Sequence, residues 1–132
     1  MKNYIFDSSA LISFFDKEKN AHSVATVLKE VNRNNHTSII SVINLGEIYY
    51  HFLRTSDKAT ADNVVTQITN LNFVVEEADW ALTKKAAAIK SLHKMSYADT
   101  FAAALCKKLK GILVTSDKEF LSLKEEITIK FV

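Results

Sequence analysis

The chain has 132 residues, 48% hydrophobic and 24% charged, a composition typical of one soluble globular domain. A chain of this length buries roughly two-thirds of its unfolded surface and needs no disulfide or metal to fold, and Cys106, the single cysteine, is interpreted as core packing. The charge is +2, no apolar stretch nears the roughly 18–20 residues that span a bilayer, and no signal peptide is apparent, so we expect a cytoplasmic protein without membrane contact.

The first half of the chain shows strand and helix patterns in alternation. In order, we expect a strand at 2–6, helices at 8–15 and 21–33, a strand at 38–40, and helices at 42–54 and 58–70. Ser8 and Ser41 stand where a helix N-cap is needed. The apolar residues of 21–33 recur at helical spacing, which predicts an amphipathic helix.

The second half continues the alternation. We expect a strand at 72–75, a helix from Asp79 onward and another at 97–110. A strand at 112–115, a short helical turn at 118–121 and a last strand at 127–131 follow. Gly111 suits the left-handed position that follows a helix end. Strands that alternate with helices predict crossover connections. We therefore expect an α/β fold: one domain over 1–132, with a mostly parallel sheet of about five strands and helices on both faces.

Four acidic residues stand at the edges of apolar segments: Asp7, Glu47, Asp99 and Asp117. Taken singly, the two that follow strands could be helix caps, and the two within helices could lie on solvated faces. However, Glu47 and Asp99 are enclosed by apolar neighbours, and a buried carboxylate without a partner is costly. Ligands of an open α/β sheet bind at the carboxyl ends of its strands. Acids that converge there must hold protons or bind a hard cation such as Mg²⁺.

Charge and local packing add two weaker expectations. If the four acids share one pocket, the remaining surface carries 17 basic residues against 11 acidic ones, which suits a polyanion. A mixed, well-solvated surface is the alternative. Gly46 costs helix stability beside Glu47, and we expect close packing there to explain it. Nearby cations that could grip such a polyanionic strand include Lys17, Lys19, Arg54, Lys94 and Lys118.

The four acids lie in segments that resemble a known family. These segments are Ile5-Phe6-Asp7-Ser8-Ser9-Ala10-Leu11-Ile12, Glu47 after Ser41-Val42, residues 96–104 (SYADTFAAA) and residues 114–120 (VTSDKEF). In order and spacing they resemble a PIN domain, most of all the VapC-type toxin ribonucleases of toxin–antitoxin systems. The resemblance covers essentially the whole chain. It implies a parallel sheet, Mg²⁺ or Mn²⁺ bound by the acids, and Ser9 and Thr115 as hydroxyl partners that orient them.

The resemblance also implies an activity and a partner. A PIN toxin of this kind hydrolyses RNA phosphodiester bonds, leaving a 5′-phosphate and a 3′-hydroxyl, and is blocked by an antitoxin protein. Metal-activated water accounts for this chemistry without a histidine or lysine base. Two alternatives stay open: a catalytically silent module that binds metal or RNA, and a housekeeping RNA-processing nuclease without an antitoxin. One bound ion or two fit the four acids equally.

Other readings of the motifs fit less well. A haloacid dehalogenase-type phosphatase requires a second Asp where Ser9 stands, and a receiver domain requires an acidic pair after its first strand, where Ser8 and Ser9 follow Asp7. A nucleotide-binding enzyme would need a glycine-rich phosphate loop, which this sequence lacks. The four histidines form no ligand-spaced cluster. The segment Tyr49-Tyr50-His51-Phe52-Leu53 is apolar on more than one side of its helix. It indicates either core packing or a surface for a homodimer or an antitoxin.

Overall fold

The computed structural model describes residues 1–132 and contains five strands, six α-helices and one 3-10 helix. In chain order they are β1 (Asn3–Phe6), α1 (Ser8–Phe15), α2 (Ala21–Arg33), β2 (Thr37–Ser41), α3 (Val42–Thr55), α4 (Lys58–Asn70), β3 (Val74–Glu76), α5 (Trp80–Leu92), α6 (Tyr97–Leu109), β4 (Ile112–Thr115), η1 (Lys118–Leu123) and β5 (Thr128–Phe131). The expected α/β fold is confirmed, with most boundaries within a few residues of those predicted.

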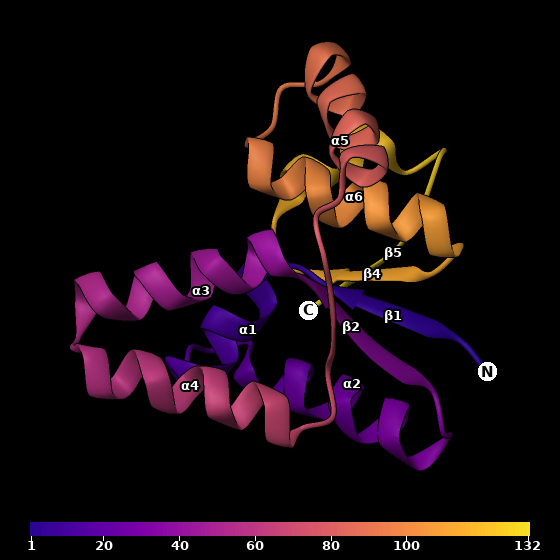
Figure 1. The fold of residues 1–132 in the computed structure, drawn as a ribbon. Helices are drawn as coiled ribbons and strands as arrows, with labels where there is room; N and C mark the ends of the chain where they lie inside the picture. Colours follow the sequence, from indigo (N-terminus) through magenta and orange to yellow (C-terminus); the bar gives the residue numbers. More distant parts are fainter.

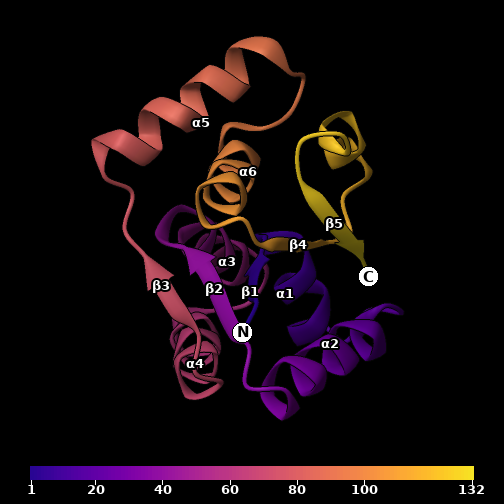
Figure 2. The same ribbon diagram turned by 90° about the vertical axis from the view of Figure 1, so that its right-hand side faces the viewer.

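All five strands join one parallel sheet in the order β3-β2-β1-β4-β5 (Figures 1 and 2). The central strand β1 pairs with β2 on one side and with β4 on the other. Phe6 pairs with Val114, so Asp7, which follows β1, and Thr115, the last residue of β4, lie at the same edge of the sheet. This edge is the carboxyl end of the strands, where the sequence placed a site.

Alternate residues of the inner strands fill two separate cores. Ile5, Ile39 and Leu113 pack with α5, α6 and η1, whereas Phe6, Ile40 and Val114 pack with α1 to α4. Figure 2 shows α5 and α6 on one side of the sheet and α1, α2 and α4 on the other. Strands that are buried on both faces read as continuous apolar runs, which is why the sequence pattern revealed them.

Two predicted local features are wrong. Asp7, not Ser8, caps α1: its side chain accepts a hydrogen bond from the Ala10 N–H, and Ser8 is already helical. The third strand begins at Val74 rather than Asn72. Asn72 takes a left-handed conformation with φ of 64°, which turns the chain after α4 and cannot continue a strand.

The two glycines act differently from expectation. Lys110, with φ of 51°, takes the left-handed position after α6, and Gly111 has no positive φ. A Cβ on Gly111 would collide with the Ile5 side chain and lie 2.6 Å from the Asn3 carbonyl oxygen, so glycine lets β4 start close against β1. A Cβ on Gly46 would meet nothing within 4 Å, so close packing does not explain that residue.

Three further expectations can be compared with the structure. Cys106 is buried in the core, and burial raises the pKa of its thiol to about 11. In α3, Phe52 is buried, whereas Tyr50 and Leu53 are 48% and 41% exposed, so core packing accounts for only part of that apolar segment. A homodimer or antitoxin surface there stays a prediction. The chain contains no helix whose length and apolarity would let it traverse a bilayer.

Candidate functional site

Asp7 lies at the end of β1, completely buried, and accepts hydrogen bonds from three donors. Ser9 Oγ lies 2.8 Å from Oδ1 and 3.0 Å from Oδ2, the Ala10 N–H donates to Oδ1, and Thr115 Oγ1 donates to Oδ2 at 2.7 Å. Burial raises the pKa of this carboxyl to about 6, although the bonds from Thr115 and Ser9 oppose the rise. The structure thus places both predicted hydroxyls on Asp7.

Thr115 also connects Asp7 to the next acid. Its Oγ1 accepts a hydrogen bond from the Asp117 N–H at 3.0 Å, and Ser9 Oγ accepts one from the Ser116 N–H at 3.2 Å. Asp117 follows β4 and caps η1, because its Oδ1 accepts from the Glu119 N–H at 2.9 Å. The two acids that follow strands are therefore helix caps and also members of one cluster, so the structural and functional interpretations of them are compatible.

Asp99 enters the same edge of the sheet from the first turn of α6. It is only 7% exposed, and its backbone N–H donates to Ser96 Oγ, the helix cap. Burial, followed by the charges of Asp7, Asp117 and Glu47, raises the pKa of Asp99 to about 7. These charges act on Asp99 only because the four acids have been brought together, as the sequence predicted.

Glu47 reaches the site from α3 and is half-buried. Its Oε1 accepts hydrogen bonds from Ser8 Oγ at 2.7 Å and from Asn44 Nδ2 at 3.2 Å. No side-chain nitrogen of Lys, Arg or His lies within 4 Å of a carboxylate oxygen of the four acids, since every ion pair of the protein is elsewhere. The cluster therefore carries negative charge that no side chain neutralises.

Glu119 is a fifth acid at the site, and the sequence prediction missed it. One carboxylate oxygen each from Asp99, Asp117 and Glu119 lie within 4.8 Å of one another. The 3-10 turn after Asp117 brings the residue two positions later back to the same side. An acid at that spacing after a strand end was the available signal. Ser8 and Asn44, both bonded to Glu47, were also missed.

These residues line an open hollow of about 500 Å³ with a single hydrophobic residue in its wall. The wall is formed by Ser8, Ser9, Ile12, Ser13, Glu18, Glu47, Ser96, Asp99, Ser116, Asp117 and Glu119. Asp7 does not line the hollow; it is fully buried and bonded to Ser9, which does. None of the five predicted cations lines the hollow, and Lys118 instead lies over the Phe131 ring, 4.4 Å from its centroid. Their role in gripping a polyanion stays a prediction.

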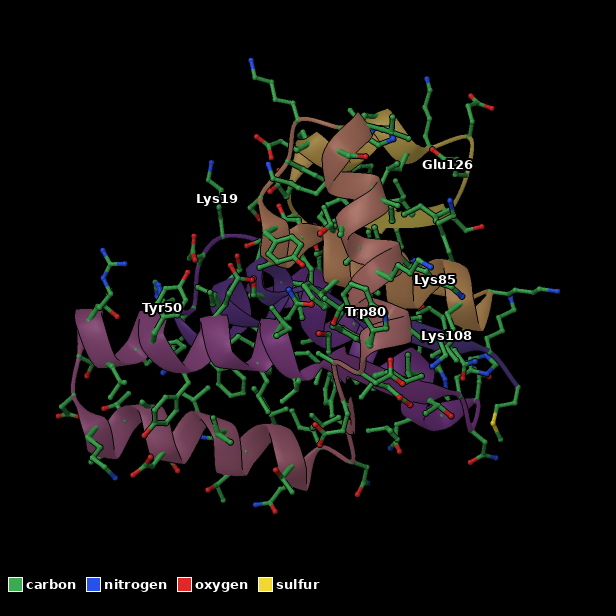
Figure 3. The ribbon with its side chains drawn as sticks, turned by 45° about the horizontal axis from the view of Figure 1, so that its top comes forward. Lys19, Tyr50, Trp80, Lys85, Lys108 and Glu126 are labelled. Carbon is green, nitrogen blue, oxygen red and sulfur yellow. The ribbon has the colours of Figure 1, made fainter.

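A second hollow, of about 430 Å³, lies between α5, α6 and the C-terminal segment and is more apolar. Figure 3 shows Lys85 and Lys108 projecting from these neighbouring helices. Its one carboxylate, Glu126, is held by Lys107 at 2.8 Å, and its pKa is lowered, first by that hydrogen bond. No converging acids occur here, so this hollow is not the candidate site.

The donor set of the first hollow decides which cation fits. Its ligand atoms are carboxylate oxygens, with no cysteine or histidine among them. Oxygen ligands suit hard cations such as Mg²⁺ and Mn²⁺, whereas zinc prefers nitrogen and sulfur. The excess negative charge and the raised pKa values of Asp7 and Asp99 fit a divalent ion that would replace protons. The ligand roles of the four acids stay a prediction.

A parallel α/β sheet with converging acids at its carboxyl edge is the arrangement of a class of α/β proteins that bind their ligands at this edge. The family model of the PIN domain matches residues 4–126, and the chain belongs to this family. A comparison with curated proteins gives no match.

Solved structures share the fold at low sequence identity. VapBC2 of Rickettsia felis, bound to a DNA fragment from its promoter, has 13% identity and a TM-score of 0.79, with 98% of each chain covered. DNA-bound VapBC of Salmonella typhimurium has 17% identity and a TM-score of 0.76, with 99% of this chain and 98% of that one covered. VapC20 of Mycobacterium tuberculosis, described as a toxin that cleaves the sarcin-ricin loop, has 14% identity and a TM-score of 0.72, with 90% and 93% covered.

Proposed function

We propose that this protein is a Mg²⁺-dependent endoribonuclease, the toxin of a toxin–antitoxin pair. The observation that carries the proposal is the cluster of acids without a cationic partner, around an open hollow at the carboxyl edge of β1 and β4. Membership of the PIN family supports a nuclease. VapC20, described as a toxin that cleaves the sarcin-ricin loop, supports RNA as the substrate.

The chain's own residues would divide the work in a definite way. Asp99, Asp117 and Glu119 offer oxygens close enough to hold one ion, and Glu47 faces the same hollow from α3. Ser9 and Thr115 hold the Asp7 carboxylate in place by hydrogen bonds, so that its negative charge stays next to the other acids. A bound Mg²⁺ or Mn²⁺ supplies the chemistry, by lowering the pKa of water and stabilising the leaving oxygen of a phosphodiester.

The open shape of the hollow suits a strand rather than a small molecule. Its wall is polar, and hydroxyl groups of Ser8, Ser9, Ser13 and Ser96 surround the acids. The hydroxyls of Ser8 and Ser9 already donate to Glu47 and Asp7, whereas those of Ser13 and Ser96 donate to no protein acceptor. Ser13 and Ser96 can therefore donate hydrogen bonds to phosphate oxygens, which the carboxylates alone would repel. We expect these two serines to bind an RNA phosphate at the hollow, with the product ends that the family resemblance implies.

A cleavage assay on RNA with added Mg²⁺ or Mn²⁺ tests the proposal. Asp99→Asn keeps the side-chain shape and removes the charge, so it should abolish cleavage while the protein remains folded by circular dichroism. Asp62→Asn, an exposed acid of α4 paired with Lys58, is the matched control and should cleave normally. If Asp99→Asn cleaves as well as the wild type, the site is wrong. If the wild type binds RNA and metal but cleaves nothing, the protein is a silent module.

We further propose an antitoxin that covers the acidic hollow. VapBC structures resemble this chain, and in them the toxin is complexed with its partner. A guanidinium can form bidentate bonds with carboxylates, so a partner that presents Arg to Asp99 or Asp117 would compete with the metal. Expression of the chain alone should slow growth, and co-expression with its neighbouring gene should restore it. A harmless chain that does not bind its neighbour's product would favour a housekeeping nuclease.

A further inference from the structure

Asn44 is a completely buried polar residue one helical turn before Glu47 in α3. Its amide nitrogen donates two hydrogen bonds, to Glu47 Oε1 at 3.2 Å and to the Ala98 carbonyl oxygen at 3.1 Å. Ala98 immediately precedes Asp99 in α6. One side chain therefore touches an acid on α3 and joins it to the turn of α6 that carries a second acid.

The orientation of the Asn44 amide follows from its neighbours. Both Glu47 Oε1 and the Ala98 carbonyl oxygen are acceptors, so the NH₂ group must face them and the carbonyl Oδ1 must point elsewhere. Oδ1 has no donor, and it is the one buried side-chain polar atom of this protein without a hydrogen bond. A leucine of similar size would fill the space without leaving such an atom. Folding alone therefore does not explain an asparagine here.

We propose that Asn44 is a positioning residue for the metal-binding carboxylates, an inference that rests on the proposed function. Its two donors hold Glu47 in one rotamer and set the separation of α3 from the start of α6. Glu47 and Asp99 then face the same hollow before any ion arrives. Partners that orient metal-binding side chains commonly contribute 10–100-fold to affinity.

The role predicts that stability and metal affinity respond differently to Asn44→Leu. Glu47 keeps its bond from Ser8, and the Ala98 carbonyl lies within α6, where the helix supplies a backbone donor. The melting temperature of the metal-free variant should thus be equal to or higher than that of the wild type. Its Mn²⁺ affinity, measured from the electron paramagnetic resonance signal of free Mn²⁺, should fall about 10–100-fold.

A double-mutant cycle tests whether Asn44 acts through Glu47. Glu47→Gln should itself weaken Mn²⁺ binding, and adding Asn44→Leu to it should cause much less further loss than in the wild type. Ile68→Val, a buried change in α4, is the control for mild loss of stability and should leave Mn²⁺ affinity unchanged. Asn44→Ala, which adds no bulk, replaces Asn44→Leu if the leucine variant does not fold.

The outcomes separate this inference from the proposed function. If the wild type binds Mn²⁺ and Asp99→Asn does not, but the Asn44 variant binds as tightly as the wild type, the positioning role is refuted and the proposed function stands. Equal losses in the presence and absence of Glu47 would also overturn it. If the wild type binds no Mn²⁺ at millimolar concentrations, the proposed function fails, and this inference fails with it.

Discussion

Replacing Asp7 with Asn should make the metal-free protein more stable, although it should abolish activity. Burial raises the pKa of Asp7 from its ordinary 3.8 to about 6. One pKa unit corresponds to about 1.4 kcal/mol, so ionised Asp7 costs the metal-free fold about 3 kcal/mol. Asparagine has one acceptor oxygen where Asp7 has two, and the bond from Thr115 must be rearranged. The rearranged hydrogen bond should cost about 1 kcal/mol, so the free energy of unfolding of Asp7→Asn should exceed that of the wild type by about 2 kcal/mol.

The sign of this effect depends on pH. The folded state binds the Asp7 proton more tightly than the unfolded state does, so the contribution of Asp7 to stability is greatest below about pH 4. It is lost as the pH rises towards 6, where the carboxyl ionises in the fold. The gain from Asp7→Asn should therefore be near its maximum at pH 8 and vanish or reverse at pH 4.

Thermal unfolding in the presence of EDTA at pH 4, 6 and 8 measures this difference. For a protein of this size, 2 kcal/mol corresponds to a melting temperature higher by roughly 6–10 °C. Asp57→Asn is the matched control, since Asp57 also caps a helix but is exposed and has a pKa lowered by its bond from the Thr60 N–H. It should not stabilise the protein at any pH. A destabilised Asp7→Asn at pH 8, or a difference independent of pH, would refute the reasoning.

Three further outcomes are expected. Mg²⁺ or Mn²⁺ should raise the melting temperature, and EDTA should reverse the effect. The rise should be larger at pH 8 than at pH 6, because Asp99, with a pKa of about 7, must release its proton before it can bind the ion. A rise that does not depend on pH would contradict this. Thr115→Val should raise the pKa of Asp7 further and weaken Mn²⁺ binding about tenfold, measurable by carboxyl NMR titration and calorimetry. Gly111→Ala should cost about 1–3 kcal/mol in urea unfolding, since the added methyl group meets the Asn3 carbonyl oxygen; a neutral result would show that β1 yields.

The sequence predicted the features that depend on local periodicity. Apolar runs located the strands because these are buried on both faces, and helical spacing located the helices. The acids after β1 and β4 could be expected to meet, because the carboxyl ends of parallel strands share an edge. Assigning the first cap to Ser8 failed because Asp7 and Ser8 are adjacent and both are good capping residues.

Features that depend on packing between elements could not be predicted in this way. Asn44 matters because α3 lies against the start of α6, and no spacing in the sequence reveals that contact. Glu119 joins the site because η1 is a tight 3-10 turn. In an α-helix the side chain of Glu119 would point in a different direction. Nor could the sequence show that no lysine lines the hollow, because the distance of each lysine from the acids depends on how the helices and strands pack.

The bond from Thr115 to Asp7 joins residues 108 positions apart, across strands that only the last third of the chain completes. Until β4 has been synthesised and inserted beside β1, Asp7 lacks its hydroxyl partner, and Asp117 and Glu119 do not yet exist. On the proposed function, a nascent or prematurely terminated chain therefore has no nuclease activity. Pairing of β4 with β1 and assembly of the acid cluster are therefore one event, so any variant that loosens this strand pair should also weaken the site.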